Sequence, residues 1–274
     1  MTIKEIRHYF KSIIHEHLPY HWLEEYLLFV IKKDKVFLIT HDDYELSNAE
    51  YQALSDGITK MQNGTPLAYL LGEQEFWGRT FKVNHHTLIP RADTEKLIEV
   101  VLGFVQDNHT TKGRILDLGT GTGCIAITLA KELPNFDVLA VDYSCGAVSI
   151  ANDNIKALQV DNCQVLHSDW FHNVQGVFDI VVSNPPYIDE NDEHLVNLVA
   201  EPITALTAKD NGLADIKHII KNAKEFLAND GLLAIEHGYK QAKEIQAMFH
   251  SHHFKNIRTI KDYGNNDRIT LGQK

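Results

Sequence analysis

Apolar residues recur at intervals of three and four between Ile3 and about Leu71, which is the spacing of amphipathic helices. Ser47 is followed three residues later by Glu50, and this pair predicts a capping box at the start of a helix that ends at about Met61. The first 70 or so residues are therefore expected to form a small helical bundle, which we place at residues 1–73.

A different pattern follows the bundle. The sequence Asn63-Gly-Thr-Pro66 predicts a chain break, and residues 76–83 predict two short strands around a glycine turn. We therefore expect a connecting hairpin within residues 74–87 and a second domain over residues 88–274.

In the second domain, apolar strands alternate with helical segments. The expected helices are 124–132, 145–158, 216–227 and 239–250. The expected strands are 114–118, 137–142, 164–167, 179–183, 231–236, 257–260 and 268–271. Alternation of this kind is typical of a parallel sheet covered on both faces, whereas the last two strands suggest a closing hairpin. The fold class is therefore α/β, with a doubly wound, mostly parallel sheet of seven strands.

Composition excludes several classes of protein. With 26 Lys and Arg against 37 Asp and Glu, the net charge is −11, which argues against a nucleic-acid binder. No apolar stretch approaches the roughly 20 residues of a membrane helix, and the charged N-terminal region does not resemble an export signal. The three widely spaced cysteines predict a reduced, cytoplasmic protein without disulfides. The 16 histidines lack ligand spacing, so no metal site is expected.

A glycine-rich turn follows the first parallel strand. It reads Asp117-Leu-Gly119-Thr120-Gly121-Thr122-Gly123 and opens a helix. Ligands bind at the carboxyl ends of strands in doubly wound sheets, and glycines there let the backbone approach a ligand closely. The turn predicts a cofactor site. By itself it does not distinguish a nicotinamide cofactor from S-adenosylmethionine.

The next two strands end in residues suited to an adenosine group. Asp142 closes one strand, where its carboxylate can accept hydrogen bonds from both ribose hydroxyls. Ser168-Asp169-Trp170 closes the other. The Trp170 indole can cover a face of adenine, and Asp169 can accept from its amino group. Three neighbouring strand ends thus predict a nucleoside pocket.

The fourth motif indicates the chemistry. Asn184-Pro185-Pro186-Tyr187 follows the apolar strand at 178–183. The prolines fix two φ angles, so the carbonyls of Asn184 and Pro185 are rigid acceptors for an NH₂ group. Tyr187 can stack on a flat amide. The motif predicts methylation of an amino or amide nitrogen, provided that it opens onto the same pocket as the glycine turn.

Together these motifs resemble the class I S-adenosylmethionine methyltransferases that act on glutamine side chains. Further stretches extend the resemblance to the bacterial peptide chain release factor glutamine methyltransferases over nearly the whole chain. These stretches are Gly64–Tyr69, Leu71–Trp77, Leu88–Glu95, Glu201–Pro202, Ala205–Leu206 and Ile235–Gly238. Ala92 departs from the family pattern, which usually has a proline there, so a looser loop is expected.

The resemblance implies a Rossmann-like methyltransferase sheet, and release factors as the protein substrate. It implies that residues 119–123, Asp142, Trp170 and Asn184 contact S-adenosylmethionine, which leaves as S-adenosylhomocysteine. Residues 184–187 would hold the glutamine of a Gly-Gly-Gln motif, and the N-terminal bundle would help to dock the release factor. Neither a nucleic acid nor a membrane partner is expected.

Other functions stay open at this point. A related enzyme of the same class methylates a glutamine of a ribosomal protein, and DNA adenine N6-methyltransferases share the Asn-Pro-Pro-Tyr motif. The glycines and Asp142 also permit a nicotinamide oxidoreductase, although the motif at 184–187 has no role there. A non-catalytic adenosine-binding adaptor is the remaining alternative.

Overall fold

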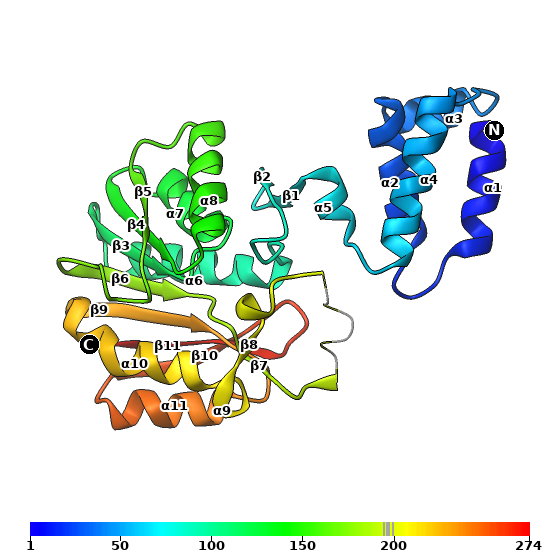
Figure 1. The fold of residues 1–274 in the computed structure, drawn as a ribbon. Helices are drawn as coiled ribbons and strands as arrows, with labels where there is room; N and C mark the ends of the chain where they lie inside the picture. The colour runs from blue at the N-terminus through cyan, green and yellow to red at the C-terminus, as the bar shows by residue number, and fades with distance from the viewer. Residues whose placement is uncertain (194, 196–197, 199) are drawn as a thin grey trace. The chain divides into compact units, whose positions relative to one another are not determined.

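The computed structural model divides the chain into two compact units (Figure 1). Residues 1–193, 195, 198 and 200–274 are described. Within this part of the chain, Met1–Glu73 belongs to the first unit, and Gln74–Leu195 with Glu201–Lys274 belongs to the second. We refer to them as the helical unit and the sheet unit.

The helical unit consists of helices, as the apolar spacing predicted. They are α1 (Ile3–Ile13), α2 (Tyr20–Ile31), α3 (Lys35–Thr40), α4 (Asn48–Gln62) and α5 (Leu67–Leu71). The predicted capping box is present at α4, where Ser47 and Glu50 bond each other's backbone N–H groups. Apolar faces of the helices share one core, which includes Phe10, Leu23 and Ile58.

The expected hairpin is formed by β1 (Glu73–Phe76) and β2 (Arg79–Lys82) around Gly78. The buried side chain of Asn154 holds β2, the second strand of this hairpin. Asn154 accepts from the Lys82 N–H at 2.8 Å and donates to the Lys82 carbonyl at 3.1 Å, and it also donates to the Thr122 carbonyl at 2.8 Å. The hairpin and the glycine turn therefore share an anchor.

The central sheet has seven strands in the order β10-β11-β9-β6-β3-β4-β5. The five strands from β9 to β5 run parallel, whereas β11 is antiparallel to both of its neighbours. Their bounds are β3 (Gly113–Leu118), β4 (Phe136–Asp142), β5 (Cys163–His167), β6 (Phe178–Ser183), β9 (Leu227–Glu236), β10 (Lys255–Lys261) and β11 (Asp267–Gln273). The predicted fold class is confirmed.

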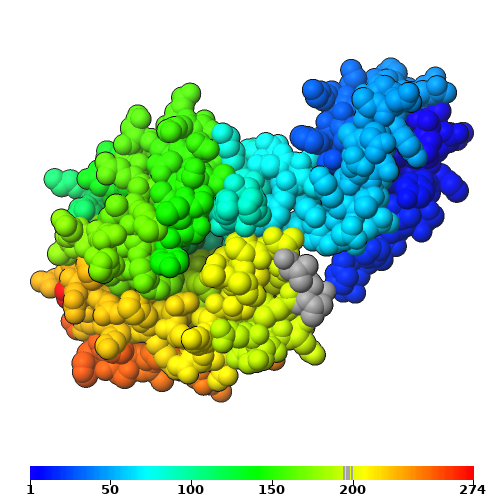
Figure 2. All heavy atoms as spheres, viewed as in Figure 1, coloured from blue at the N-terminus to red at the C-terminus, as the bar shows by residue number. Residues whose placement is uncertain are grey.

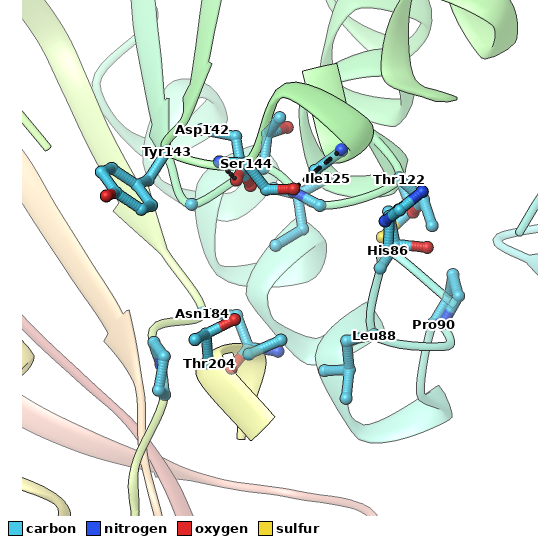
Figure 3. A pocket seen from close by; sticks show the side chains of 18 of the residues that line it. His86, Leu88, Pro90, Thr122, Ile125, Asp142, Tyr143, Ser144, Asn184 and Thr204 are labelled. Carbon is cyan, nitrogen blue, oxygen red and sulfur yellow. Dashed lines mark hydrogen bonds between the residues drawn. The ribbon is translucent and has the colours of Figure 1, made fainter. Parts of the chain in front are cut away.

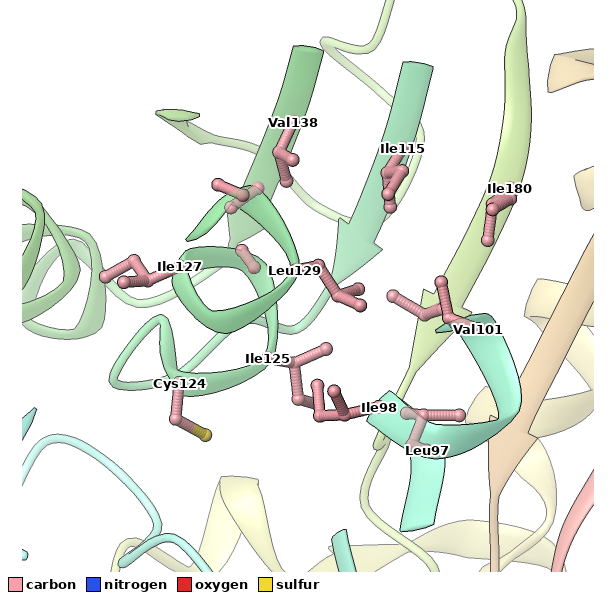
Figure 4. Packing of buried hydrophobic residues seen from close by; sticks show 14 of the residues in the cluster. Leu97, Ile98, Val101, Ile115, Cys124, Ile125, Ile127, Leu129, Val138 and Ile180 are labelled. Atoms are coloured by element: carbon pink, nitrogen blue, oxygen red, sulfur yellow. The ribbon is translucent and has the colours of Figure 1, made fainter. Parts of the chain in front are cut away.

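Helices cover both faces of this sheet. They are α6 (Glu95–Asp107), α7 (Cys124–Glu132), α8 (Cys145–Leu158), α10 (Ala214–Phe226) and α11 (Ala242–Ser251). Successive strand residues point to opposite faces, so Ile115 packs with α6 and α7 whereas Leu116 packs with α10 and α11. Figure 4 shows Leu97, Ile98 and Val101 of α6 beside Ile125 and Leu129 of α7.

Among the elements predicted within residues 88–274, two boundaries differ from the prediction by three residues or more. Strand β9 begins at Leu227 rather than at 231, and α11 begins at Ala242 rather than at 239. Before α11, the Gln241 side chain accepts from the Gly238 N–H and donates to the Tyr187 carbonyl, contacts that hold this stretch outside the helix.

The segment after β6 forms small elements beside the sheet. They are β7 (Ile188–Asp189), η3 (Ile203–Ala205), β8 (Thr207–Ala208) and α9 (Lys209–Gly212), and β7 pairs with β8. The short helix η1 (Ala92–Thr94) leads into α6. Among the described residues, no helix combines the length and apolar character needed to span a bilayer.

Candidate active site

A cavity of about 360 Å³ lies at the carboxyl ends of the parallel strands. This volume is within the usual range for small-molecule pockets. Figure 3 shows Asn184 and Thr204 on one side, Asp142 and Tyr143 across from them, and Leu88 nearby. In the space-filling view, the yellow segment that includes η3 lies next to the green segment that includes β4 and α8 (Figure 2).

Most of the predicted site residues line this one cavity. The lining includes Gly119, Thr120, Gly121, Thr122, Asp142, Asp169, Trp170, Asn184 and Pro186. The glycine turn and the Asn-Pro-Pro-Tyr motif therefore open onto the same space, as their predicted chemistry requires. Gly123, Pro185 and Tyr187 lie outside the lining.

The glycine turn is bent back toward β4. The N–H groups of Gly119 and Thr120 both donate to the Val141 carbonyl at 2.9 Å. Gly121 has φ +57°, and Gly123, with φ +81°, is the N-cap of α7. Side chains rarely adopt such φ values, so these positions favour glycine. No atom lies within 4 Å of the place a Cβ would take on Gly121, so a side chain there would enter the cavity.

Asp142 connects this turn to the start of α8. Its Oδ2 accepts from the Gly121 N–H and its Oδ1 accepts from the Ser144 N–H, both at 2.8 Å. Burial raises the pKa of this carboxyl group, although the two N–H donors oppose the increase. Each oxygen of a carboxylate has a second lone pair, so Asp142 can still accept from hydroxyl groups in the cavity.

Trp170 packs its ring against the glycine turn. A Cβ on Gly119 would lie 3.4 Å from this ring. The Trp170 backbone has φ +45°. Asp215, at the start of α10, also lines the cavity and was missed by sequence reasoning. Burial raises the pKa of Asp215, and so does the negative charge of the nearby Asp169. This end of the cavity thus combines an aromatic face with two carboxylates.

Asn184 follows β6 directly and is held by a residue far away in sequence. Its Nδ2 donates to the Thr94 hydroxyl at 3.2 Å. Among the described residues, no donor reaches its Oδ1, which is free to accept from a bound amide N–H. Nothing in the sequence around Thr94 indicated this contact, because 90 residues separate the pair.

Tyr187 is not among the residues that line the cavity. Its ring packs against the core on the α10 and α11 face, and its hydroxyl lies 3.5 Å from Glu236 Oε1. Burial raises the pKa of Tyr187 well above its usual range. Pro185 is also buried. Their roles in substrate binding therefore stay predictions.

The loop at 88–95 forms another wall. Glu201, nearly fully buried, accepts from the Ile89 N–H at 3.1 Å and forms an ion pair with Arg91. This loop was expected to be loose because of Ala92. Glu201 instead holds the residues on both sides of Pro90. Sequence reasoning quoted Glu201 within a motif but gave it no role.

No group of three or more metal-ligating side chains occurs among the described residues. His85 and His86 contact each other through their rings, with centroids 4.0 Å apart.

Two family models match the chain. A model described as the PrmC N-terminal domain matches residues 5–72, and one described as the methyltransferase small domain matches residues 98–209. Among solved structures, the human METTL16 catalytic domain has a TM-score of 0.60 at 18% identity, covering 76% of this chain and 79% of that one. A methyltransferase from Pyrococcus furiosus has a TM-score of 0.55 at 16% identity, covering 80% and 98%. These two structures support the fold.

Curated relatives are much closer in sequence. The release factor glutamine methyltransferase of Aliivibrio fischeri is 41% identical over 90% of this chain and 87% of its own length. The Escherichia coli protein of the same name is 41% identical over 89% and 88%. The Buchnera aphidicola protein from Acyrthosiphon pisum is 39% identical over 100% and 99%. This chain therefore belongs to the release factor glutamine methyltransferase family.

Proposed function

We propose that this protein transfers a methyl group from S-adenosylmethionine to the side-chain amide nitrogen of the glutamine in the Gly-Gly-Gln motif of peptide chain release factors. The observation that carries the proposal is the shared cavity, which the glycine turn and Asn184 both line. Family membership supports the choice of acceptor. Since release factors act during translation, we place the protein in the cytoplasm.

The residues at the cavity fit S-adenosylmethionine. A side chain on Gly121 would occupy cavity space, so the turn leaves room for a ligand against its backbone. Asp142 offers carboxylate lone pairs for ribose hydroxyls, whereas Trp170 and Asp169 offer a ring face and an acceptor for adenine. When bound, S-adenosylmethionine supplies a methyl carbon activated by its sulfonium.

Asn184 would orient the acceptor. An amide nitrogen is a poor nucleophile, because its lone pair is delocalised into the carbonyl. We propose that Asn184 Oδ1 and the Pro185 carbonyl accept the two N–H groups and turn the nitrogen toward the methyl carbon. As the new bond develops, the nitrogen becomes more acidic and these hydrogen bonds strengthen, which stabilises the transition state selectively. Tyr187 would support the flat amide. The enzyme's contribution is then positioning and electrostatics.

The helical unit would recognise the substrate protein. Residues 1–73 contain helices that share their own core, and the hairpin of β1 and β2 spans residues 73–82. We propose that residues 1–73 dock the release factor while residues 88–274 carry out methyl transfer, without contact with nucleic acid or membrane.

The test is a methylation assay with purified components. The enzyme is incubated with isotopically labelled S-adenosylmethionine and either a release factor, the same factor with its acceptor glutamine changed to alanine, a ribosomal protein fraction, or duplex DNA. We expect label only on the unmodified release factor, at that glutamine by peptide mass spectrometry. Label on the ribosomal fraction or DNA instead would refute the proposal.

A further inference from the structure

The last carbonyl of the Asn-Pro-Pro-Tyr motif is held by a side chain from another part of the chain. Gln241, which precedes α11, donates from its Nε2 to the Tyr187 carbonyl at 3.0 Å and to the Asn211 carbonyl at 3.1 Å. Its Oε1 accepts from the Gly238 N–H at 2.9 Å. Both hydrogens and the oxygen of this carboxamide therefore bond to the backbone, and these three bonds fix its orientation.

The same peptide unit is held on its other side. The Ile188 N–H, which belongs to one peptide unit with the Tyr187 carbonyl, donates to the Leu206 carbonyl at 3.0 Å. Leu206 directly follows η3, whose residues Thr204 and Ala205 line the cavity. The peptide unit that ends the motif is thus bonded to Gln241 on one side and to the cavity wall on the other.

The carbonyl of Asn211 belongs to an unusual turn. Asp210, Asn211 and Gly212 of α9 have φ values of +63°, +57° and +79°, so three successive residues adopt the left-handed conformation. Such a run is unfavourable for L-residues and persists only where its surroundings fix it. A Cβ on Gly212 would lie 2.1 Å from the Tyr187 oxygen. Glycine is therefore needed for this close approach of α9 to the motif.

The prolines make the motif depend on contacts of this kind. Pro185 and Pro186 have no N–H to donate, and their rings fix φ. One end of the motif is held by the hydrogen bond from Asn184 to Thr94, and the other end by the bond from Gln241 to the Tyr187 carbonyl. A stiff segment held at its two ends transmits a displacement of one end to the carbonyls between them.

We propose that Gln241 and Gly212 are positioning residues, which set the place of the Pro185 carbonyl through the Tyr187 carbonyl. The inference rests on the proposed function, in which the Pro185 carbonyl accepts from the substrate amide. The hold on the Tyr187 peptide unit does not depend on that function and can be measured without substrate.

The substitution Gln241→Glu tests the two donated bonds. Glutamate keeps the length of the side chain and an acceptor for Gly238, but its carboxylate cannot donate to the carbonyls of Tyr187 and Asn211. Both carbonyl oxygens then face a negative charge, so the Tyr187 peptide unit should move away. A displacement of about 1 Å can lower turnover about 10²-fold, and we expect kcat to fall at least about tenfold. The Kd for S-adenosylhomocysteine should change less than about twofold.

Asn162→Asp is the matched control for this variant. Asn162 Nδ2 donates to the carbonyls of Ala130 and Phe136, both at 2.9 Å, and to that of Leu133 at 3.4 Å. Phe136 begins β4, whereas the cavity lies at the carboxyl ends of the strands. The control removes bonds of the same kind and should lower the urea midpoint similarly, but it should leave kcat unchanged. Equal kcat in the two variants would overturn the proposal.

Gly212→Ala tests the approach of α9 to the motif. Its methyl group would displace the Tyr187 oxygen and should also lower kcat at least about tenfold. Gly78→Ala is the control, because Gly78 has φ +66° and no atom within 4 Å of a Cβ, but lies in the hairpin. Both variants strain the backbone, whereas only Gly212→Ala should slow turnover. An unchanged kcat in Gly212→Ala would show that the turn does not position the motif.

A readout without substrate separates this inference from the proposed function. In the ligand-free protein, the Ile188 amide should exchange its hydrogen for deuterium at least about tenfold faster in Gln241→Glu than in the wild-type protein or Asn162→Asp. Unchanged exchange would refute the inference even if release factors are methylated. Faster exchange, with a wild-type enzyme that methylates no release factor, would support the hold on Tyr187 and refute the proposed function instead.

Discussion

The carboxylate of Glu201 accepts a hydrogen bond from the backbone N–H of Ile89, 112 residues earlier in the chain, at 3.1 Å. The same side chain pairs with Arg91, so one buried acid holds both sides of Pro90. Leu88, Pro90 and Arg91 line the cavity. The shape of this wall therefore depends on Glu201.

Glu201→Ala should destabilise the protein and weaken ligand binding together. It leaves a buried N–H without an acceptor, which costs about 1 to 3 kcal/mol of unfolding free energy. We expect this loss in urea denaturation, with an increase in the Kd for S-adenosylhomocysteine in calorimetry. Glu201→Gln keeps an acceptor for Ile89 and should lose less. An alanine variant with unchanged stability and Kd would contradict this role.

Asn184→Ala should act mainly on turnover. The side chain would accept from the substrate nitrogen in the transition state, so its removal should lower kcat by roughly 10² or more. Binding of S-adenosylhomocysteine, measured by calorimetry, should change much less. Normal turnover in this variant would refute the assignment of Asn184.

Gly121→Val should weaken cofactor binding through the space its side chain takes. Gly78→Val is the matched control, because Gly78 also has a positive φ, +66° against +57°, and no atom within 4 Å of a Cβ, but lies in the hairpin. Both variants should lose about 1 to 3 kcal/mol of stability from backbone strain. Only Gly121→Val should raise the Kd for S-adenosylhomocysteine, by about tenfold or more. Equal Kd values for the two variants would show that the glycine turn is not part of the binding site.

Asp117 should make stability depend on pH. This acid is fully buried below the glycine turn, and burial raises its pKa to about 7 although Thr120 donates to it at 2.6 Å. The folded state holds its proton more tightly than the unfolded state does. The stability that this group contributes is therefore present below about pH 4 and lost as the pH rises to about 7.

Asp117→Asn should remove that dependence. Denaturation at several pH values should show the wild-type protein losing free energy of unfolding relative to the variant between about pH 4 and pH 7. A constant difference between the two proteins over this range would show that Asp117 does not retain its proton in the folded state.

The helices next to the glycine turn could be predicted to the residue because their start signals are local. Gly123 caps α7, and the Ser144 side chain caps α8 by accepting from Ala147 N–H at 3.2 Å. The start of α11 was predicted too early, since Gln241 bonds to Tyr187, 54 residues away. A contact of that kind leaves no trace in the local pattern.

The same limit applies to the candidate site. The glycines, Asp142 and Asn184 could be identified from the sequence because each follows or ends a parallel strand. The carboxyl ends of these strands lie at one edge of the sheet, so the residues there lie close together. Thr94 and Asp215 could not, because each reaches the cavity from a helix start whose polar residue is ordinary for that position. Tyr187 shows the reverse case, a motif residue whose side chain packs into the core.

The anchor formed by Asn154 has a consequence for local unfolding. Detachment of β2 breaks the two hydrogen bonds between the Asn154 side chain and the Lys82 backbone. The Asn154 carboxamide then becomes partly exposed and keeps only its hydrogen bond to the Thr122 carbonyl. The hairpin and the glycine turn should thus open in one cooperative step. The Lys82 amide should then exchange its hydrogen for deuterium no faster than the amides of the glycine turn do. A displacement of the hairpin would therefore affect the glycine turn through the Asn154 side chain.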